Sequence, residues 1–576
     1  MEDPNAKGPP RFASVAGLER FLGDPFAAAC PYSLQAALEA DERESFPEAA
    51  VAGLIEWGYL ERMIPAERGG QLDSFEEAVA LQRCVSRRDL TAAIALGQTF
   101  LGSVPAWLAG TPDQQAAQAA ILRSGGLAAL ALTEEQHGAD VLAGEVRADP
   151  AGPGRVKLTG TKWLINNGTR ARSLAVFARE GTAEGLGGFS IFAVDKQRLD
   201  GESFSPLPKQ RTHGIRGADI SGIEFRGAEL AESARLGPMG SGAELLLQTL
   251  QITRVGCCGF SLGAADTGLA LAASFALGRK IYGARAWDLP HAQATLGAAF
   301  VDLLVCECVT TAAARAVQAA PEQLSLISAV AKSFVPARID GLLQSCAVVL
   351  GARHYLRQGP HAAFQKLLRD AAVVSLFDGS LPVNLDAVGT QLLRLSPRRA
   401  ADSQTREAAL NGIFDLRQPL PPIDRSRFAL LTGGRDDVTQ GMTESMDLIR
   451  GRPSSPWRDQ IEAHAKAAAE EVARAAAELD ALQAVDRAAL KRSPELFELA
   501  ERHCRLWAAA ACVQLWARSG SILGPFIEEG AWLALGLDRL LSPLRSPRPP
   551  RRHPALAAAA AELQRLVSPS SSSGTS

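Results

Sequence analysis

The chain has little that would commit it to nucleic acid, to an anionic membrane or to an oxidising compartment. Its 60 Lys and Arg residues nearly balance its 63 Asp and Glu residues, so the formal net charge of -3 gives no general reason to expect either polyanionic partner. Its nine cysteines are scattered and form no Cys-x-x-Cys pair, and several lie in apolar helical runs, as at Cys257, Cys258, Cys306 and Cys308. We therefore expect reduced thiols packed in a core, with neither a disulfide framework nor a metal site.

Targeting and membrane signals are also missing. The first residues, MEDPNAKGPPRF, lack the apolar segment of a secretory signal. A membrane-spanning helix needs about 20 apolar residues, and we expect no uncharged apolar run of that length. These features predict a cytoplasmic protein without membrane contact.

The usual fingerprints of cofactor and catalytic sites are absent. The sequence has no G-x-G-x-x-G after a strand, no Walker loop, no H-E-x-x-H and no G-x-S-x-G elbow. The function must therefore be inferred from less regular motifs.

What the chain does have is length and apolar content. With 576 residues, 47% of them hydrophobic, it is long enough for several domains. Apolar residues recur at helical spacing in 1–125, whereas 126–238 contains short β-type runs such as VKLTGTKWLI and FSIFAV between turns. Long apolar helices return in 239–398. The fold class is thus α+β and mainly α, with an N-terminal helical domain, a central β-barrel or sheet domain and a C-terminal four-helix bundle.

The remaining residues predict an addition to that core. A proline-rich linker is expected over 399–439, an additional Ala-rich helical domain over 440–566, and a disordered tail over 567–576. The stretch LRSPRPPRRH holds Arg545, Arg548, Arg551 and Arg552 among prolines. That arrangement is more typical of an exposed loop than of a nucleic-acid-binding face, and no nucleic acid is expected as a partner.

Four short motifs could carry chemistry. LALTEEQHGAD (130–140) stands at the start of the β region and GTKWLINNG (160–168) lies inside it; RKIYG (279–283) and LLRDAAVVSLFDGS (367–380) lie in the predicted bundle. In this order and spacing the motifs resemble those of the acyl-CoA dehydrogenase family, over about residues 12–395. The resemblance implies the same fold order, an FAD cofactor and an oxidoreductase acting on an acyl thioester.

The resemblance also implies where FAD would bind. Leu132 and Thr133 would hydrogen-bond the flavin pyrimidine edge, Gly138 would let the backbone approach closely, and Trp163 would lie against the ring. Ala139 and Ile165 occupy two further positions that the family uses at the cofactor. Arg279 would contact the FAD pyrophosphate of a neighbouring subunit, which predicts a homodimer or homotetramer. Tyr282 of the same motif and Gly351 of a glycine-rich loop are also implied to bind the cofactor, and Ser380 begins a stretch that in the family often touches its adenine end. For Trp163 alone, a place in the core of the β domain is the alternative.

Asp378 is the implied catalytic base, because family members remove a proton alpha to a thioester with a carboxylate at this position. Its backbone N–H would help to hold the substrate carbonyl oxygen. Arg254 matches a family arginine near this loop, with a helix-surface ion pair as the alternative.

Several positions depart from the family pattern. Ile165 replaces a usual Thr, Ala139 a frequent Ser, Phe377 a Tyr, and Asp378 is one methylene shorter than Glu. Only the first glycine and the aromatic of a glycine-rich loop survive, as Gly351 and Tyr355. A remodelled flavin pocket with altered redox chemistry is expected.

Three functions stay open on this evidence. The first is a dehydrogenase or oxidase of an acyl-CoA or acyl-carrier-protein thioester, in biosynthetic tailoring for example, with an electron-transfer flavoprotein or oxygen as acceptor. The second is a flavin monooxygenase or a carbon-acid oxidase similar to nitroalkane oxidase. The third is a non-catalytic binding protein in which the fold serves assembly. The added helices resemble those of very-long-chain acyl-CoA dehydrogenases or of DNA-damage-response relatives.

Overall fold

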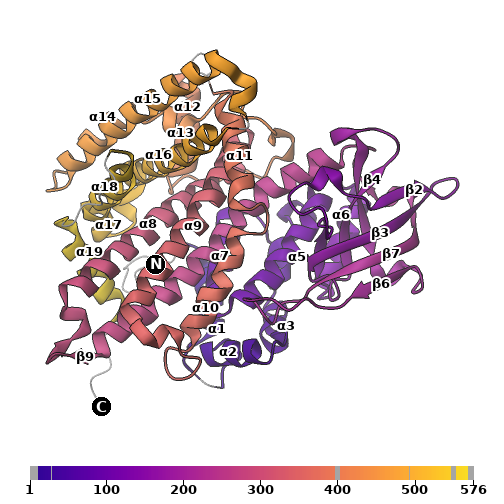
Figure 1. Cartoon of the computed structure of the whole chain (residues 1–576), viewed down its shortest axis with the longest axis horizontal. Coiled ribbons are helices and arrows are strands. Elements are labelled where there is room, and N and C mark those ends of the chain that lie inside the picture. Colours follow the sequence, from indigo (N-terminus) through magenta and orange to yellow (C-terminus); the bar gives the residue numbers. More distant parts are fainter. Residues whose placement is uncertain (1–10, 28, 396–401, 492, 546–552, 569–576) are drawn as a thin grey trace.

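A sheet domain stands on one side of the molecule and helices fill the other (Figure 1). The structure is a computed structural model that describes residues 11–27, 29–395, 402–491, 493–545 and 553–568. Along the chain the elements run from helices through strands and back to helices, which is the predicted order. The α+β, mainly helical fold expected from the sequence is confirmed.

Among the described residues before the sheet there are six α-helices: α1 (Ala13–Leu22), α2 (Leu34–Glu42), α3 (Glu48–Glu56), α4 (Phe75–Arg88), α5 (Leu90–Ala109) and α6 (Pro112–Arg123). Helix α6 begins with a capping box in which Thr111 and Gln114 each satisfy the other's backbone N–H. Helix α5 carries no charged residue along its 20 residues and is buried almost throughout. It forms the layer between the sheet and the later helices, touching β1 and α7.

The length of α5 corrects one expectation from the sequence. Within the part of the chain that the structure describes, four stretches are long and apolar enough to cross a membrane by length and composition: α5, Gly242–Gly278, Pro290–Ala319 and Pro321–Tyr355. The expectation that no uncharged apolar run reaches about 20 residues was wrong for α5. In the protein, 89% of its most apolar window is buried against other elements, which accounts for the composition.

Eight strands form one mixed sheet in the order β6-β7-β3-β2-β4-β5-β8, with β1 paired in parallel to β4. The strands are β1 (Ala128–Ala131), β2 (Arg147–Pro150), β3 (Arg155–Asn166), β4 (Ser173–Glu180), β5 (Phe189–Asp195), β6 (Phe204–Leu207), β7 (Ile220–Ala231) and β8 (Arg235–Leu236). Strand β3 alternates between buried and exposed residues over most of its length, as a strand with one covered face does.

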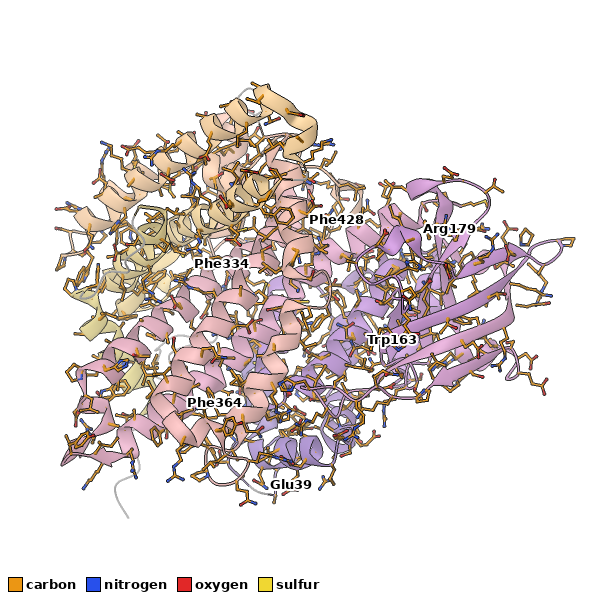
Figure 2. All side chains as sticks on the ribbon, in the orientation of Figure 1. Glu39, Trp163, Arg179, Phe334, Phe364 and Phe428 are labelled. Carbon is orange, nitrogen blue, oxygen red and sulfur yellow. The ribbon has the colours of Figure 1, made fainter. Side chains whose placement is uncertain are left out.

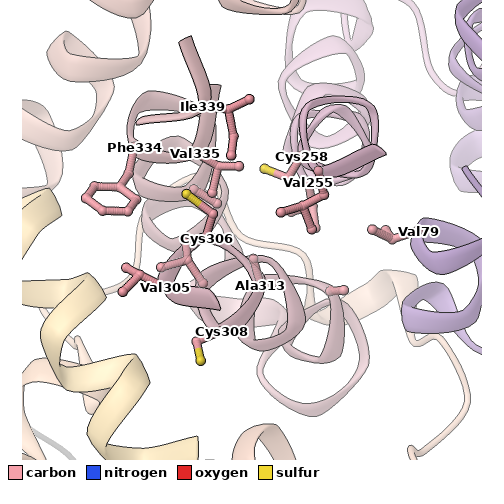
Figure 3. Close-up of a cluster of buried hydrophobic side chains, with 14 of the residues drawn as sticks. Val79, Val255, Cys258, Val305, Cys306, Cys308, Ala313, Phe334, Val335 and Ile339 are labelled. Carbon is pink, nitrogen blue, oxygen red and sulfur yellow. The ribbon is translucent and has the colours of Figure 1, made fainter. Parts of the chain in front are cut away.

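Three long helices make the centre of the helical part: α7 (Gly242–Gly278), α8 (Pro290–Ala319) and α9 (Leu324–Leu350). A two-stranded hairpin, β9 (Lys280–Ile281) with β10 (Ala284–Arg285), joins the first two, and α10 (Ala363–Ala371) and α11 (Leu381–Leu392) follow α9. Cys258, Cys306 and Val335 lie in the apolar cluster of Figure 3. Eight of the nine cysteines are buried, Cys30 is half-buried, and all nine are free thiols.

The C-terminal third adds further helices to α8, α9 and α11. These are α12 (Ser403–Phe414), α13 (Asp437–Gln440), α14 (Ser445–Gly451), α15 (Arg458–Leu490), α16 (Pro494–Ser519), α17 (Pro525–Glu529), α18 (Ala531–Arg545) and α19 (Ala555–Val567). Helix α12 lies inside the segment predicted as a linker, and its residues Leu410, Ile413 and Phe414 are buried. Most of the basic stretch 544–553 and of the predicted tail lie outside the described residues.

Candidate functional site

Asp378 lies on a short loop between α10 and α11, and the loop has an unusual backbone. Asp378 has a φ of 54° and Gly379 a φ of 95°, both in the left-handed region. Such a φ is uncommon for a residue with a side chain, so the surrounding structure must hold it. A Cβ added to Gly379 would lie 3.1 Å from Asn384 Nδ2 and 3.2 Å from Arg254 Nη2, which is a close fit for any residue but glycine.

Buried side chains from three helices hold the loop through its carbonyl groups. Arg254 of α7 donates from Nε to the Asp378 carbonyl at 3.0 Å, and Lys332 of α9 donates to the carbonyls of Val374 (2.7 Å) and Gly379 (3.1 Å). From α11, Asn384 donates to the Gly379 carbonyl at 2.7 Å. The Asp378 backbone N–H donates to no other group among the described residues.

The Asp378 carboxyl group turns toward α7. Its Oδ2 accepts a hydrogen bond from the Cys257 thiol at 3.6 Å, and no salt bridge joins it to a cation in the described part of the chain. Burial raises the pKa of Asp378 above its ordinary value, and the nearby charges of Lys332 and Arg254 offset this only in part. A carboxylate with a raised pKa is a stronger base once it has lost its proton.

Arg254 is buried, and its hydrogen bond goes to a carbonyl and not to a carboxylate. A helix-surface ion pair, the alternative from the sequence, is therefore excluded. Burial lowers the pKa of Arg254, with the charge of Asp378 opposing the shift. The guanidinium group holds the loop through its hydrogen bond to the Asp378 carbonyl, and its positive charge lies near the Asp378 carboxylate.

The Arg369-Asp370 pair of the same motif joins the helices to the sheet domain. Asp370 accepts a hydrogen bond from the Ile215 backbone N–H at 2.6 Å and pairs with Lys366 at 2.6 Å. Arg369 donates to the His213 carbonyl at 2.9 Å. These contacts attach the segment before β7 to α10, so the Asp378 loop is fixed relative to the sheet domain.

Leu132 and Thr133 directly follow β1, and their carbonyl groups already accept hydrogen bonds within the protein. Lys162 donates to the Leu132 carbonyl at 2.8 Å, and the Trp163 N–H donates to the Thr133 carbonyl at 2.8 Å. Lys162 also pairs with Glu134 at 2.7 Å, where both side chains are buried. The Thr133 hydroxyl makes no hydrogen bond within the described residues, which leaves it free for a ligand.

Trp163 lies at a β-bulge in β3. The register with β7 shifts between Trp163 and Ile165, and Leu164 at the bulge has a φ of 53°. Trp163 is half-buried, so it is not a fully enclosed core residue, and Figure 2 shows it on the side of the sheet domain that faces the helices. Ile165 is 2% exposed and packs in the sheet core. The structure therefore does not support the predicted contact between its side chain and a flavin.

Three other predicted residues are not explained by contacts within the described residues. Gly138 has an ordinary φ with open space where a Cβ would stand, and Ala139 beside it is exposed. The Ser380 side chain caps no backbone group although it precedes α11. Gly351 differs from these three, because it ends α9 with a φ of 55°, a conformation that favours glycine whether or not a ligand is bound.

Arg279 and Tyr282 lie beyond the C-terminal end of α7, whereas Arg254 lies in the first half of that helix. Arg279 follows the last residue of α7, 25 positions beyond Arg254, which is about 37 Å of helix. Tyr282 is 96% exposed and has a φ of 52°. Within one chain, these two residues cannot reach the Asp378 loop; Figure 1 shows β9 on the far side of the helices from the sheet.

Two further features bear on the location of the site. A cavity of about 740 Å³ lies between α2 and residues 355–358 and includes none of the predicted catalytic or cofactor residues. Its lining includes Leu38 and Tyr355. Among the described residues, no cluster of three or more His, Cys, Asp or Glu side chains could hold a metal ion.

Sequence reasoning missed Cys257, Lys332 and the Lys162–Glu134 pair. Cys257 was interpreted as core packing only, and its contact with Asp378 joins residues 121 positions apart. Lys332 did carry a signal, because it is the one charged residue in the apolar run LISAVAKSFVPA.

Comparison with known proteins covers the first two thirds of the chain. Family models match residues 28–125 (acyl-CoA dehydrogenase, N-terminal domain), 129–228 (middle domain) and 240–393 (C-terminal domain). A probable acyl-CoA dehydrogenase, FadE25 of Mycobacterium tuberculosis, is 28% identical over 361 residues, or 62% of this chain and 90% of the relative.

Solved structures extend the similarity to the added helices. Butyryl-CoA dehydrogenase from Megasphaera elsdenii matches with a TM-score of 0.62 and 21% identity over 66% of this chain and 99% of its own. An acyl-CoA dehydrogenase from Bacillus anthracis, complexed with FAD, matches with a TM-score of 0.69 and 19% identity over 98% of this chain and 96% of its own. The latter shares the fold of the C-terminal third as well.

Proposed function

Since the chain belongs to the acyl-CoA dehydrogenase family, we propose that it binds FAD and oxidises an acyl thioester, with the Asp378 carboxylate as the catalytic base. The observation that supports this best is the loop around Asp378. Its carbonyl groups accept hydrogen bonds from buried donors, while the Asp378 N–H donates to no group among the described residues and the carboxylate contacts a thiol but no cation.

The residues present fit the cofactor at several points. The Thr133 hydroxyl is free, Trp163 is partly accessible on the side of the sheet domain that faces the helices, and Gly138 is exposed without an internal reason for glycine. One polar atom close to the Asp378 loop, Asn384 Oδ1, is buried without a hydrogen-bond partner. Unsatisfied buried polar atoms are rare in proteins and often mark a functional site. Bound FAD would supply a hydride acceptor.

The chain's own residues would act on the substrate as follows. The Asp378 carboxylate takes the proton from the carbon alpha to the thioester carbonyl, and the Asp378 N–H donates to the carbonyl oxygen, where negative charge develops. The Cys257 thiol donates to Oδ2 and keeps the carboxyl group turned toward α7. Because burial raises the pKa of Asp378, activity should fall, as pH decreases, at a higher pH than an ordinary aspartate with a pKa of about 3.9 would give.

A titration of the holoprotein tests this proposal. Purified protein with bound FAD is mixed without oxygen with a panel of acyl-CoA and acyl-carrier-protein thioesters, and loss of the flavin absorbance near 450 nm is followed. We expect Asp378→Asn to slow this bleaching by about 10²–10⁴-fold, the usual contribution of a general base. The control is Asp386→Asn on the exposed face of α11, which should leave the rate unchanged. If Asp378→Asn bleached as fast and as fully as the wild type, Asp378 would not be the catalytic base.

The carrier and the electron acceptor are finer parts of the proposal. We favour a dehydrogenase, with oxidase or monooxygenase activity as the alternative. Reoxidation of the reduced holoprotein separates them. Slow reaction with oxygen and fast reaction with an electron-transfer flavoprotein support a dehydrogenase, whereas fast reaction with oxygen and release of hydrogen peroxide support an oxidase.

We also propose a homo-oligomer in which Arg279 and Tyr282 contribute to the cofactor site of a second copy. The length of α7 supports this, because it separates them from their own Asp378 loop. Light scattering and flavin content of Arg279→Ala test the idea. Loss of FAD from a correctly assembled oligomer is the expected result, and unchanged FAD affinity would contradict it.

A further inference from the structure

Lys332 is a buried ammonium group on α9 that spans the loop carrying the base. It is 2% exposed and donates to carbonyls on both sides of Asp378, at Val374 (2.7 Å) and Gly379 (3.1 Å). Its Nζ also lies 5.7 Å from the centre of the Phe377 ring, within the range of a cation–π contact. One side chain thus contacts residues before, beside and after the base.

The backbone conformation of this loop requires side-chain contacts that hold it in place. Asp378 and Gly379 both have left-handed φ values, and a backbone in that region persists only where its surroundings determine it. Arg254 donates to the Asp378 carbonyl alone, and Asn384 donates to the Gly379 and Ser380 carbonyls, which are both at the C-terminal end of the loop. Among the described side chains, only Lys332 donates to both ends of the 374–379 segment.

The charged and titratable groups around Lys332 are few. Arg254, Cys257 and Cys258 face it from α7, and Asp378 faces it from the loop. Burial lowers the pKa of Lys332 and raises the pKa of Asp378, while their mutual attraction works against both shifts. Burial also raises the pKa of Cys257 well above its usual value, so this thiol stays protonated and does not provide the opposing charge. Asp378 is therefore the anion near Lys332 in this environment.

We propose that Lys332 is a positioning residue for the reaction: its buried ammonium group fixes the Asp378 loop at both ends and stabilises the Asp378 carboxylate as an anion. The inference rests on the proposed function, because it assumes that Asp378 is the base. It adds a residue 46 positions away, on another helix, that acts through Asp378 without touching the substrate.

Three substitutions separate the two effects of Lys332. Lys332→Met removes the charge and the hydrogen bonds, Lys332→Gln keeps amide donors without the charge, and Lys332→Arg keeps both. The control is Ser333→Ala, which removes a neighbouring buried hydroxyl that has no hydrogen-bond partner. Each variant is prepared as the FAD-bound protein.

Two measurements are made on each variant. The first is hydrogen exchange of the peptide that contains 374–380, which should become about tenfold faster in Lys332→Met and stay near wild type in Lys332→Arg. The second is the pH dependence of kcat with a thioester that bleaches the wild type. Its acid limb should move up by about one pH unit in Lys332→Met and Lys332→Gln, because an anion without its neighbouring cation takes up a proton more easily.

Unchanged exchange and an unchanged acid limb in Lys332→Met would overturn the proposal. If that variant does not fold, identical acid limbs in Lys332→Gln and Lys332→Arg would overturn it instead. Failure of the proposed function gives a different pattern: Asp378→Asn would then keep full turnover, while the exchange measurement would still report whether Lys332 holds the loop.

Discussion

The buried Lys162–Glu134 pair supports the segment that would face the cofactor, and its removal gives a specific prediction. Lys162→Met deletes the ammonium group that contacts Glu134 at 2.7 Å and the Leu132 carbonyl at 2.8 Å. The Lys162 side chain is 1% exposed and the Glu134 side chain 9%, so water cannot replace the lost partner. Removing one member of a buried pair costs about 3–5 kcal/mol.

The structure places the expected cost at the lower end of that range. Glu134 would keep two hydrogen bonds from the backbone N–H groups of Glu145 (2.7 Å) and Val146 (3.1 Å). We therefore expect Lys162→Met to lower the free energy of unfolding of the sheet domain by about 3 kcal/mol at pH 7. The deficit should shrink in acid. The pKa of Glu134 is lowered in the wild type, where the attraction of Lys162 and the hydrogen bonds outweigh the opposing effect of burial. The wild type therefore loses this stabilisation as the pH falls below about 4.3, the ordinary glutamate value.

Urea unfolding followed by circular dichroism, together with flavin content after gel filtration, measures both effects. Lys157→Met is the matched control, since Lys157 lies on the same strand and pairs at 3.3 Å with Glu229, with both side chains nearly half exposed. It should change the free energy of unfolding by less than about 0.5 kcal/mol. If Lys162→Met were as mild as this control, or kept its FAD as tightly as the wild type, the role given to the buried pair would be refuted.

Three other predictions concern the scaffold. Arg83→Met should lower the free energy of unfolding by about 3 kcal/mol near neutral pH, because it leaves buried Asp266 with one fewer cation. Arg83 also pairs with Glu307 at 3.2 Å. Burial alone would raise the pKa of Glu307, but the charge of Arg83 outweighs this effect and lowers that pKa to about 2. Thermal unfolding across pH should therefore show that the stability advantage of the wild type over Arg83→Met disappears as the pH falls from about 4.3 towards 2. Gly102→Ala should cost about 1–3 kcal/mol in urea unfolding and weaken FAD retention, since its Cβ would press on the Ala129 backbone and move α5 from β1. A thiol reagent should label Cys30 first in the folded protein and the eight buried cysteines only after unfolding, as mass spectrometry can show.

The sequence predicted the order of helices and strands and the family, because each of these depends on patterns of residues that are close together in the chain. The change from helical to β-type periodicity near residue 126 predicted the order of elements, and the four motifs identified the family. The position of Asp378 beside Arg254 also followed from the motifs, and the structure shows their contact at 3.0 Å.

Contacts between distant segments could not be predicted in the same way. The burial of Ile165 depends on a bulge that shifts the register of β3, and a bulge has little signature in one strand alone. The segment predicted as a linker holds α12 because Arg315, far away on α8, donates to the carbonyls of Gly412, Ile413, Asp415 and Gln418. An arginine in an Ala-rich helix gives no indication of which backbone it will bind.

The last described helix has a consequence for how the chain is made. Helix α19 packs against α8, where a Cβ on Gly297 would lie 3.0 Å from the Leu556 carbonyl oxygen, and its Ala559 and Leu563 are fully buried. During synthesis, the ribosome must therefore reach the residues of α19 (Ala555–Val567) before the part of α8 that α19 contacts is covered. A nascent protein stalled or truncated before residue 555 would present that surface to chaperones and to other unfinished chains.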